Sequence, residues 1–213
     1  MTNVTSPFMS KHFSLSELQT WDRFTRANFI NSLSGFKSLS LIGSVNSNGI
    51  SNLAVFSNIV HLGADPALIG FINRPLSAAP HTIRNIQETG IYTVNLVTEL
   101  MYKQAHQTSA KYPDGVSEFE MTGLTQAYRD GCIAPFVAES PVQYVLKFEQ
   151  VMPIELNGTF LVIGSLQEAY VPAEIQEEDG FLDLAKSGIL TSLGTNGYYK
   201  TEKIATLPYA KVN

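Results

Sequence analysis

The side chains that most often carry out enzyme chemistry are few and widely spaced in this chain. Its four histidines, His12, His61, His81 and His106, lack the short spacings of a metal-binding motif, so we predict no metal site. The single cysteine, Cys132, excludes an internal disulfide and a cysteine-based metal cluster within one chain. A lone cysteine without a catalytic signature is more often a small apolar residue than a nucleophile, and we interpret Cys132 in that way.

Sequence signatures of nucleotide binding and of hydrolysis are also missing. No G-x-G-x-x-G run follows a predicted strand, so a Rossmann dinucleotide site has no support. The Walker, H-E-x-x-H and G-x-S-x-G patterns do not occur either. If the chain is an enzyme, we therefore expect a bound cofactor to supply its chemistry.

Composition limits the class of protein and its partners. The 213 residues are 44% hydrophobic and 15% charged, which is typical of one folded domain with a substantial core. A net charge of −5 argues against nucleic acid as a partner. Residues 1–13 lack the apolar stretch of a signal peptide, and no segment approaches the roughly 20 apolar residues of a membrane span. We expect a single-domain cytoplasmic protein over residues 1–213, without a membrane or nucleic-acid partner.

Hydrophobic periodicity predicts a mainly β protein with peripheral helices. A capping box at Ser14 and Glu17 begins an N-terminal helix over residues 15–31. Further helices are predicted over residues 77–89, ending at Gly90, over 98–107 and over 179–186. Strands are predicted over residues 38–60 (as a hairpin), 67–72, 91–97, 142–148 and 159–171, with Asn157-Gly158 as a hairpin turn. This order favours a closed antiparallel barrel over about residues 37–171, followed by a C-terminal extension.

Residues 108–135 stand apart from this regular pattern. The segment is rich in Gly, Pro, Asp and Ser and shows only brief helical pieces. Because it is long for a structureless loop in a compact domain, we predict a lid or an interface segment there.

Six segments, taken in order, resemble the flavin reductase-like, FMN-binding split-barrel family. They are residues 31–36 (NSLSGF), 48–57 (NGISNLAVFS), 65–74 (DPALIGFINR), 81–86 (HTIRNI), 89–95 (TGIYTVN) and 117–120 (SEFE) before Gly123-Leu124. The resemblance covers about residues 30–165, and the ordered set carries it rather than any single piece. It implies an antiparallel, Greek-key-like split β-barrel that binds FMN at a homodimer interface.

The residue types in these segments suit the parts of FMN. A phosphate needs a guanidinium, hydroxyls and free backbone N–H groups. Arg74, just past a predicted strand, supplies the guanidinium, and Thr82 adds a hydroxyl near the positive end of the next helix. Asn95 is a further candidate contact.

The ring and the ribityl chain of FMN are expected along the segment from Asn52 to Asn58. Its candidate contacts are Asn52, Leu53, Ala54, Val55, Ser57 and Asn58. Phe71 or Val55 would cover an apolar ring face. Members of the family often have proline at the position of Val55, so valine adds a backbone donor there.

Each of these residues also has an ordinary structural interpretation. Arg74 fits a solvated surface position, Thr82 a helix start, and Ser57 with Asn58 the end of a strand. Phe71 fits a barrel core, and Asn95 fits a bond to backbone within the barrel. His81 is a candidate for the cleft, and Tyr198 with Tyr199 for contact with a second subunit.

The resemblance implies an FMN oxidoreductase that passes electrons from NAD(P)H to a small acceptor. Direct hydride transfer between stacked rings needs alignment and exclusion of water rather than a side-chain acid or nucleophile. Two alternatives remain open: a flavoredoxin-like electron carrier or FMN-storage protein, and a barrel with another pocket, such as a haem-binding or interaction protein.

Overall fold

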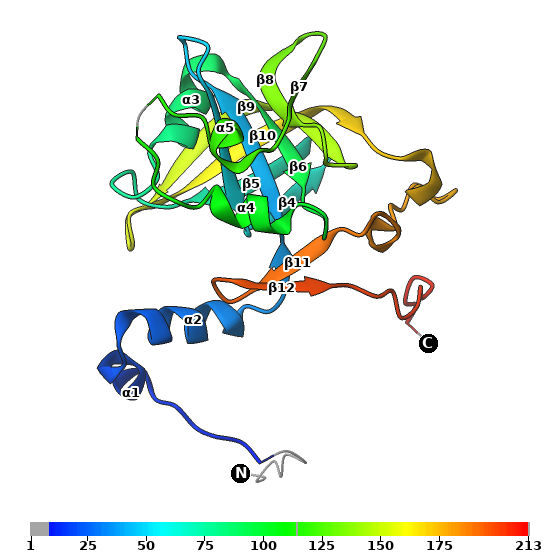
Figure 1. Ribbon diagram of the computed structural model, residues 1–213. Helices are drawn as coiled ribbons and strands as arrows, with labels where there is room; N and C mark the ends of the chain where they lie inside the picture. Colours follow the sequence, from blue (N-terminus) through cyan, green and yellow to red (C-terminus); the bar gives the residue numbers. More distant parts are fainter. Residues whose placement is uncertain (1–8, 114, 213) are drawn as a thin grey trace.

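Antiparallel hairpins build the main sheet of the protein, which the computed structural model describes over residues 9–113 and 115–212 (Figure 1). The spatial order of the strands is β3 (Ser51–Phe56), β2 (Ser40–Val45), β6 (Ile91–Leu96), β9 (Gln143–Ile154), β10 (Thr159–Tyr170), β5 (Ala67–Asn73) and β4 (Ile59–Ala64). The predicted antiparallel split barrel is confirmed. The expectation of a closed sheet is wrong, because no ladder joins the described edge strands β3 and β4.

The predicted hairpin over residues 38–60 contains two different turns. Strands β2 and β3 pair around Asn46 to Ile50, as expected. Residues 59 and 60 belong instead to β4, which pairs with β5. The chain leaves β3 at Ser57, where the Asn58 side chain bonds both the N–H and the C=O of Ile72 on β5. An amide that imitates backbone in this way ends one hairpin and begins the next.

The hairpin between β9 and β10 is confirmed, although its loop is longer than expected. Ile154 pairs with Thr159, so four residues, 155–158, form the loop. Gly158 takes a positive φ of 70°, and the Asn157 carboxamide oxygen accepts the Thr159 N–H. Asn157-Gly158 therefore closes the turn, but not as a two-residue loop.

The segment over residues 108–135 is not a structureless loop. It contains α5 (Glu118–Thr122) and most of a hairpin of β7 (Gln126–Arg129) and β8 (Cys132–Val137). A Cβ on Gly43 of β2 would lie 2.1 Å from the Pro135 carbonyl oxygen, so β8 crosses β2 at a distance that only glycine allows. The hairpin covers the barrel, and the parts of the segment that line the cavity described below are residues 108–112 and Glu118.

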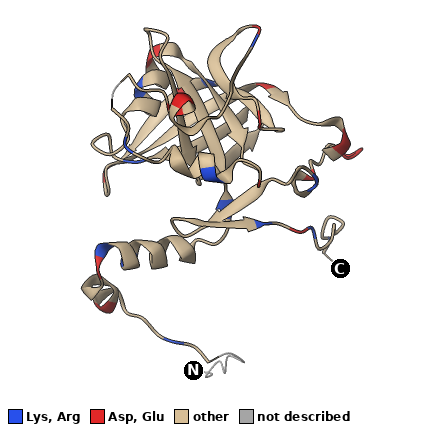
Figure 2. Ribbon diagram, in the orientation of Figure 1, with Lys and Arg blue, Asp and Glu red and all other residues tan. Residues whose placement is uncertain are grey.

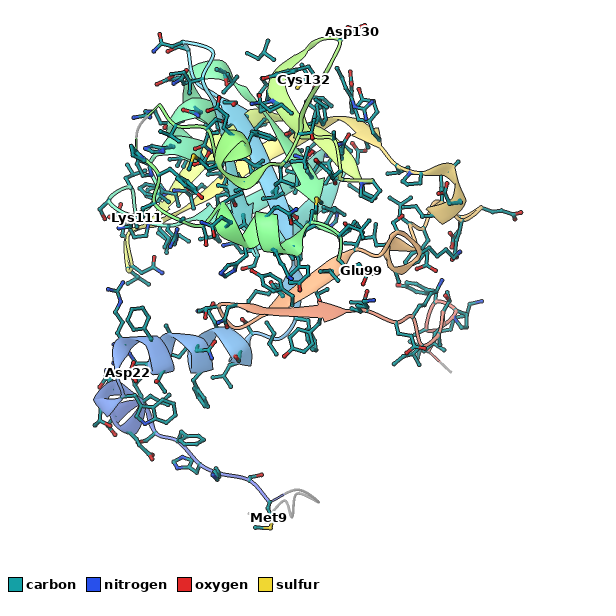
Figure 3. All side chains as sticks on the ribbon, viewed as in Figure 1. Met9, Asp22, Glu99, Lys111, Asp130 and Cys132 are labelled. Atoms are coloured by element: carbon teal, nitrogen blue, oxygen red, sulfur yellow. The ribbon has the colours of Figure 1, made fainter. Side chains whose placement is uncertain are left out.

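The predicted helix over residues 15–31 is two helices, α1 (Leu15–Thr20) and α2 (Arg23–Leu33). Ser14 caps α1, as the capping box predicts. The Asp22 carboxylate accepts the N–H groups of Phe24 and Thr25, which begins a second helix and leaves Trp21 extended (Figure 3). These bonds, chiefly those from Thr25, lower the pKa of Asp22.

The other predicted helices are shorter than expected. The helix predicted over 77–89 is α3 (His81–Thr89), which Gly90 ends with a φ of 75°. The helix predicted over 98–107 is α4 (Tyr102–Gln107). The expected helix over 179–186 is wrong: a bridge joins Gln176 to Leu182, and only a 3₁₀ turn, η2 (Leu184–Ser187), follows. A similar turn, η1 (Ala173–Ile175), precedes it.

The C-terminal extension contributes a small second sheet. Strands β11 (Leu190–Leu193) and β12 (Gly197–Lys200) form a hairpin that pairs with β1 (Lys37–Ser38). The Asn28 side-chain oxygen on α2 accepts the N–H of Thr195 in the hairpin turn. An ion pair between Lys200 and Glu99 joins β12 to the segment before α4 (Figure 3).

Helices α1 and α2 form an arm that projects from the barrel (Figure 1). Phe13, Trp21 and Phe29 stack edge to face, while α2 has no buried residue. Acidic and basic residues are interspersed along the chain (Figure 2). Among the described residues no helix is long and apolar enough to cross a membrane, and no group of three potential metal ligands occurs. Residues 1–8 of the segment inspected for a signal peptide lie outside the described residues.

Candidate functional site

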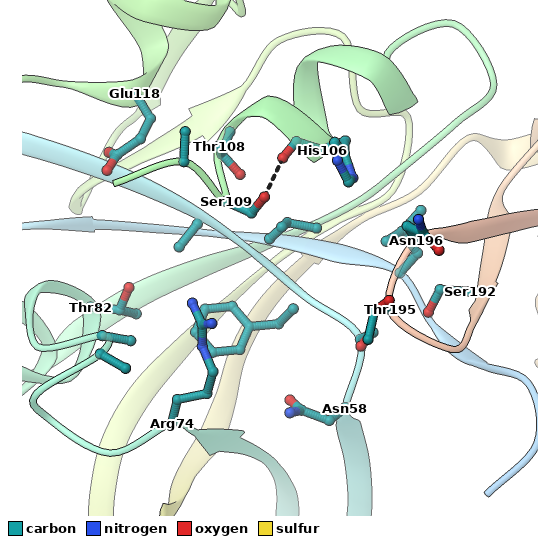
Figure 4. Close-up of a pocket in the computed structure, with 18 of the residues that line it drawn as sticks. Asn58, Arg74, Thr82, His106, Thr108, Ser109, Glu118, Ser192, Thr195 and Asn196 are labelled. Carbon is teal, nitrogen blue, oxygen red and sulfur yellow. Dashed lines mark hydrogen bonds between the residues drawn. The ribbon is translucent and has the colours of Figure 1, made fainter. Parts of the chain in front are cut away.

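A cavity of about 650 Å³ opens beside the edge strand β3 (Figure 4). Its walls come from residues 52 and 54–58, from the connection between β5 and α3, from the loop after α4, and from the turn between β11 and β12. Asn31 of the arm also borders it. This volume lies within the range of small-molecule and cofactor sites, about 300–1,000 Å³.

One end of the cavity has the properties of an anion site. Arg74 follows β5 directly and is exposed, and its guanidinium makes no hydrogen bond or ion pair with the residues that the structure describes. Helix α3 begins at His81 with no side-chain cap, so the N–H groups of Thr82 and Ile83 in its first turn are available to a ligand. A free guanidinium beside an uncapped helix start is suited to a phosphate.

Thr82 lies in the first turn of α3 at the same end of the cavity (Figure 4). The Asn52 amide on β3 donates to its hydroxyl oxygen at 3.2 Å. Because the oxygen already accepts a hydrogen bond, the Thr82 hydroxyl hydrogen remains available for donation. The arrangement therefore orients Thr82 as a donor to an anion.

Strand β3 presents backbone groups to the cavity because β3 is an edge strand. The N–H of Leu53 points away from β2, since it donates to the Glu118 carboxylate at 2.9 Å. Successive residues of an antiparallel strand alternate in the side to which their N–H and C=O groups point. The backbone of Val55, two residues on, therefore also faces the open edge beside the cavity.

The opposite end of the cavity is polar but mostly uncharged. His106 of α4 hydrogen-bonds through Nδ1 to the hydroxyl of Tyr198 on β12, and the Tyr102 ring packs against Tyr198. Burial raises the pKa of Tyr198. Asn31, Thr195 and Asn196 complete this end. It offers hydrogen bonds and aromatic surface to a ligand and provides no full negative charge.

Glu118, which has no role in the sequence-based predictions, also lines the cavity. The residue is only 7% exposed, and its carboxylate accepts the Leu53 N–H. Burial raises the pKa of Glu118, whereas the Leu53 N–H and the charge of His81 act in the opposite direction. In the sequence, Glu118 stands out only as part of the SEFE segment (residues 117–120) that carries the family resemblance, and that segment gives its side chain no role.

Comparison with known proteins identifies the family. The family described as "Flavin reductase like domain" matches residues 36–199. The chain belongs to the flavin reductase-like family. An uncharacterised protein of Halalkalibacterium halodurans is 31% identical over 157 residues, covering 71% of this chain and 75% of that protein.

Two solved structures show the same fold over nearly the whole chain. A split-barrel candidate flavin reductase from Shewanella frigidimarina has a TM-score of 0.91 and 45% identity, covering 94% of this chain and all of the other. Component B of nitrilotriacetate monooxygenase from Bacillus cereus has a TM-score of 0.81 and 20% identity, covering 93% of this chain and all of the other. At 20% identity the second likeness concerns the fold alone.

The flavin reductase-like family implies a flavin as cofactor, and the cavity of this chain fits one. Seven of the ten predicted contacts line it: Asn52, Ala54, Val55, Ser57, Asn58, Arg74 and Thr82. The free Arg74, the open helix start and the exposed backbone edge of β3 provide separate places for a phosphate and a polar ring edge.

The three other predicted contacts lie outside the cavity. Phe71 is 1% exposed and packs between Phe56 and Tyr92 in the barrel core, with ring centroids 4.8 and 5.8 Å away. The Leu53 side chain is buried beneath β3. Asn95 bonds backbone within the barrel, donating to the Leu41 carbonyl and accepting the Val137 N–H. Their ordinary structural interpretations match these positions.

Proposed function

We propose that this chain binds FMN in the cavity, as an oxidoreductase that passes electrons from NAD(P)H to a small acceptor. The observation that carries the proposal is the uncommitted guanidinium of Arg74 beside the uncapped start of α3, within a flavin reductase-like chain. FMN ends in a phosphate of nearly two negative charges, and this end of the cavity provides the matching donors. FMN, when bound, supplies the exchange of hydride and single electrons.

Residues of this chain would bind and orient the group. The Arg74 guanidinium, the Thr82 hydroxyl and the N–H groups of Thr82 and Ile83 hold the phosphate. The open edge of β3 at Val55, with Ser57, faces the polar rim of the ring. The Asn58 side-chain amide already hydrogen-bonds the backbone of Ile72. We therefore propose that Asn58 fixes the β3–β4 turn beside the ligand rather than contacting the ligand itself.

NAD(P)H is proposed to enter from the end formed by His106 and Tyr198. This end offers polar hydrogen-bonding groups and aromatic surface, which suit a carboxamide-bearing ring. Stacking of the two rings would require water to leave the cavity, and residues 108–112 lie at its wall.

A homodimer is part of the same proposal. Phe24 is 81% exposed and Leu33 is 70% exposed on α2, which buries nothing within its own chain. An isolated helix of 11 residues is marginal in water, so a second copy of the chain would stabilise the arm. Since Asn31 of α2 borders the cavity, the partner would then lie next to the bound ligand. We also propose a cytoplasmic location, which fits the buried, unpaired Cys132.

The visible spectrum of the purified protein, before and after reconstitution with FMN, tests the binding. A flavin spectrum that remains with the protein after gel filtration is expected. A protein that stays colourless after reconstitution contradicts the proposal. Steady-state oxidation of NADH and NADPH with added FMN then tests the activity: turnover is expected, and binding without turnover would favour an electron carrier or a storage protein.

A further inference from the structure

Glu118 is the one acidic side chain among the described residues that line the cavity. The other charged or titratable side chains along the wall are Arg74, Lys111, His81, His106, Tyr112 and Tyr198. A carboxylate in such a place opposes an anionic ligand that the other groups attract.

One hydrogen bond holds this carboxylate against β3, and a second holds the residue before it. Its Oε2 accepts the Leu53 N–H at 2.9 Å, and the neighbouring Ser117 hydroxyl bonds the Ser51 hydroxyl at 2.8 Å. The first turn of α5 is thereby attached to β3 on both sides of Asn52. Glu118 therefore cannot swing into solvent without breaking a buried bond.

The carboxylate also lies close to the anion-binding end. Asn52, the residue before Leu53, donates to Thr82 at the start of α3. Glu118 and Thr82 consequently approach β3 at adjacent residues, and Figure 4 shows both on the same side of the cavity. A phosphate held by Thr82 would share this region with the Glu118 charge.

We propose that Glu118 limits the preference of the cavity for phosphorylated over unphosphorylated flavins, an inference that rests on the proposed FMN site. Its ionised carboxylate opposes the phosphate at Arg74 and Thr82, and it acts on the uncharged ring much less. Glu118 is thus a positioning residue for β3 whose charge also sets ligand selectivity.

The surroundings of Glu118 give this opposition a pH dependence. Helix α5 packs on β3, which carries no titratable side chain, and on α4, which carries Tyr102, Lys103 and His106. Arg74, His81 and Lys111 contribute positive charge from the remaining wall. Because burial favours the protonated form of Glu118, the opposition is weakest at acidic pH and grows as the carboxyl loses its proton.

The test compares FMN with riboflavin, which is the same ring and ribityl chain without the phosphate. Glu118→Gln removes the charge but keeps an oxygen that can accept the Leu53 N–H. Dissociation constants for both ligands are measured from about pH 6 to about pH 8.5, because the second pKa of a phosphate is about 6. Glu120→Gln, at an exposed position of the same helix, is the matched control for the change in net charge.

We expect Glu118→Gln to tighten FMN binding about tenfold near pH 8, which is the scale of two unit charges about 10 Å apart at an effective dielectric constant near 20. Riboflavin binding should change less than about twofold, and Glu120→Gln should change neither ligand. The FMN advantage of Glu118→Gln should shrink towards about pH 6, where the FMN phosphate begins to lose its second negative charge.

The outcomes separate this inference from the proposed function. If the wild-type protein binds no flavin, the FMN site itself is wrong. If the wild type binds both ligands and Glu118→Gln changes them equally, the site stands and the selectivity role of Glu118 is refuted. Should Glu118→Gln misfold by circular dichroism, Glu118→Ala replaces it. For Glu118→Ala the ratio of the FMN and riboflavin dissociation constants still tests the role of the charge. Loss of the bond to the Leu53 N–H would weaken the binding of both ligands to the same extent.

Discussion

The two ends of the cavity differ in how the chain builds them. Arg74 begins the connection from β5 to α3, and Thr82 lies in the first turn of α3 at its other end. A single short stretch of the chain therefore makes the anion site. The end formed by His106 and Tyr198 instead joins α4 to the C-terminal hairpin, with Asn31 added from α2. The first end depends on local structure, whereas the second depends on the packing of distant segments.

The two ends also differ in charge and support. The anion-binding end combines a free guanidinium with an uncapped helix, supported from below by the barrel core. The other end consists of polar side chains carried partly by the small sheet. The arm contacts this sheet through the hydrogen bond from the Thr195 N–H to Asn28. We therefore expect mutations at the anion-binding end to change the affinity for the phosphate of the ligand. Mutations at the other end should change the binding of the second substrate.

The largest expected effect is on stability and comes from the core beneath the anion-binding end. Phe71→Ala should lower the free energy of unfolding by about 3–5 kcal/mol, because it leaves a cavity between Phe56 and Tyr92. Denaturant unfolding without flavin measures this loss. Leu156→Ala, at a position 99% exposed in the β9–β10 loop, is the control and should change stability by less than about 0.5 kcal/mol. A selective loss of FMN affinity in Phe71→Ala, without loss of stability, would instead place Phe71 in the binding site.

The second effect tests the charge of the anion-binding end. Arg74→Ala should weaken FMN binding about 10- to 100-fold, since a hydrogen bond to a charged group contributes about 1.5–3 kcal/mol. Riboflavin binding should change less than about threefold, because it lacks the phosphate. Flavin fluorescence quenching measures both, with Arg23→Ala on the exposed arm as the control. An FMN affinity unchanged within about threefold would show that the phosphate lies elsewhere.

The contrast between the ends explains what the sequence could predict. Alternation of apolar residues and turn signals placed the strands that lead to Arg74 and Thr82, because local propensity and burial agree there. The break at Asp22 was missed because its side chain caps a new helix inside an apolar period. Phe71 was assigned to the ligand because an aromatic on a buried strand can face either the core or a cleft, and sequence does not record which.

Long-range packing explains which contacts the sequence could not predict. Tyr198 meets His106 only because β11 and β12 fold back to pair with β1, and the two residues are 92 positions apart. The hydrogen bond between Glu118 and Leu53 joins residues 65 positions apart, and no periodic pattern in the sequence predicts it. The residues that line this part of the cavity therefore become visible only in three dimensions.

A third prediction concerns the backbone edge between the two ends. Val55→Pro removes a single N–H that faces the cavity, and it breaks no ladder bond because that backbone points away from β2. FMN and riboflavin should both bind about 2- to 10-fold more weakly, the scale of one net hydrogen bond. Val55→Ala keeps the donor and should bind both ligands within about twofold of the wild type. Unchanged affinity in Val55→Pro would mean that the flavin does not use this edge.

The smallest expected effect tests the end that the distant segments assemble. Tyr198→Phe removes the hydroxyl that bonds His106 while keeping the ring against Tyr102, so stability should fall by no more than about 1.5 kcal/mol. FMN affinity should stay within about twofold, and the KM for NAD(P)H should rise a few-fold, since His106 loses the bond that fixes its ring. Tyr199→Phe, on the next residue and half exposed, is the matched control for loss of a tyrosine hydroxyl. Weaker FMN binding with an unchanged KM would reverse the roles of the two ends, because the flavin rather than the second substrate would then depend on the C-terminal hairpin.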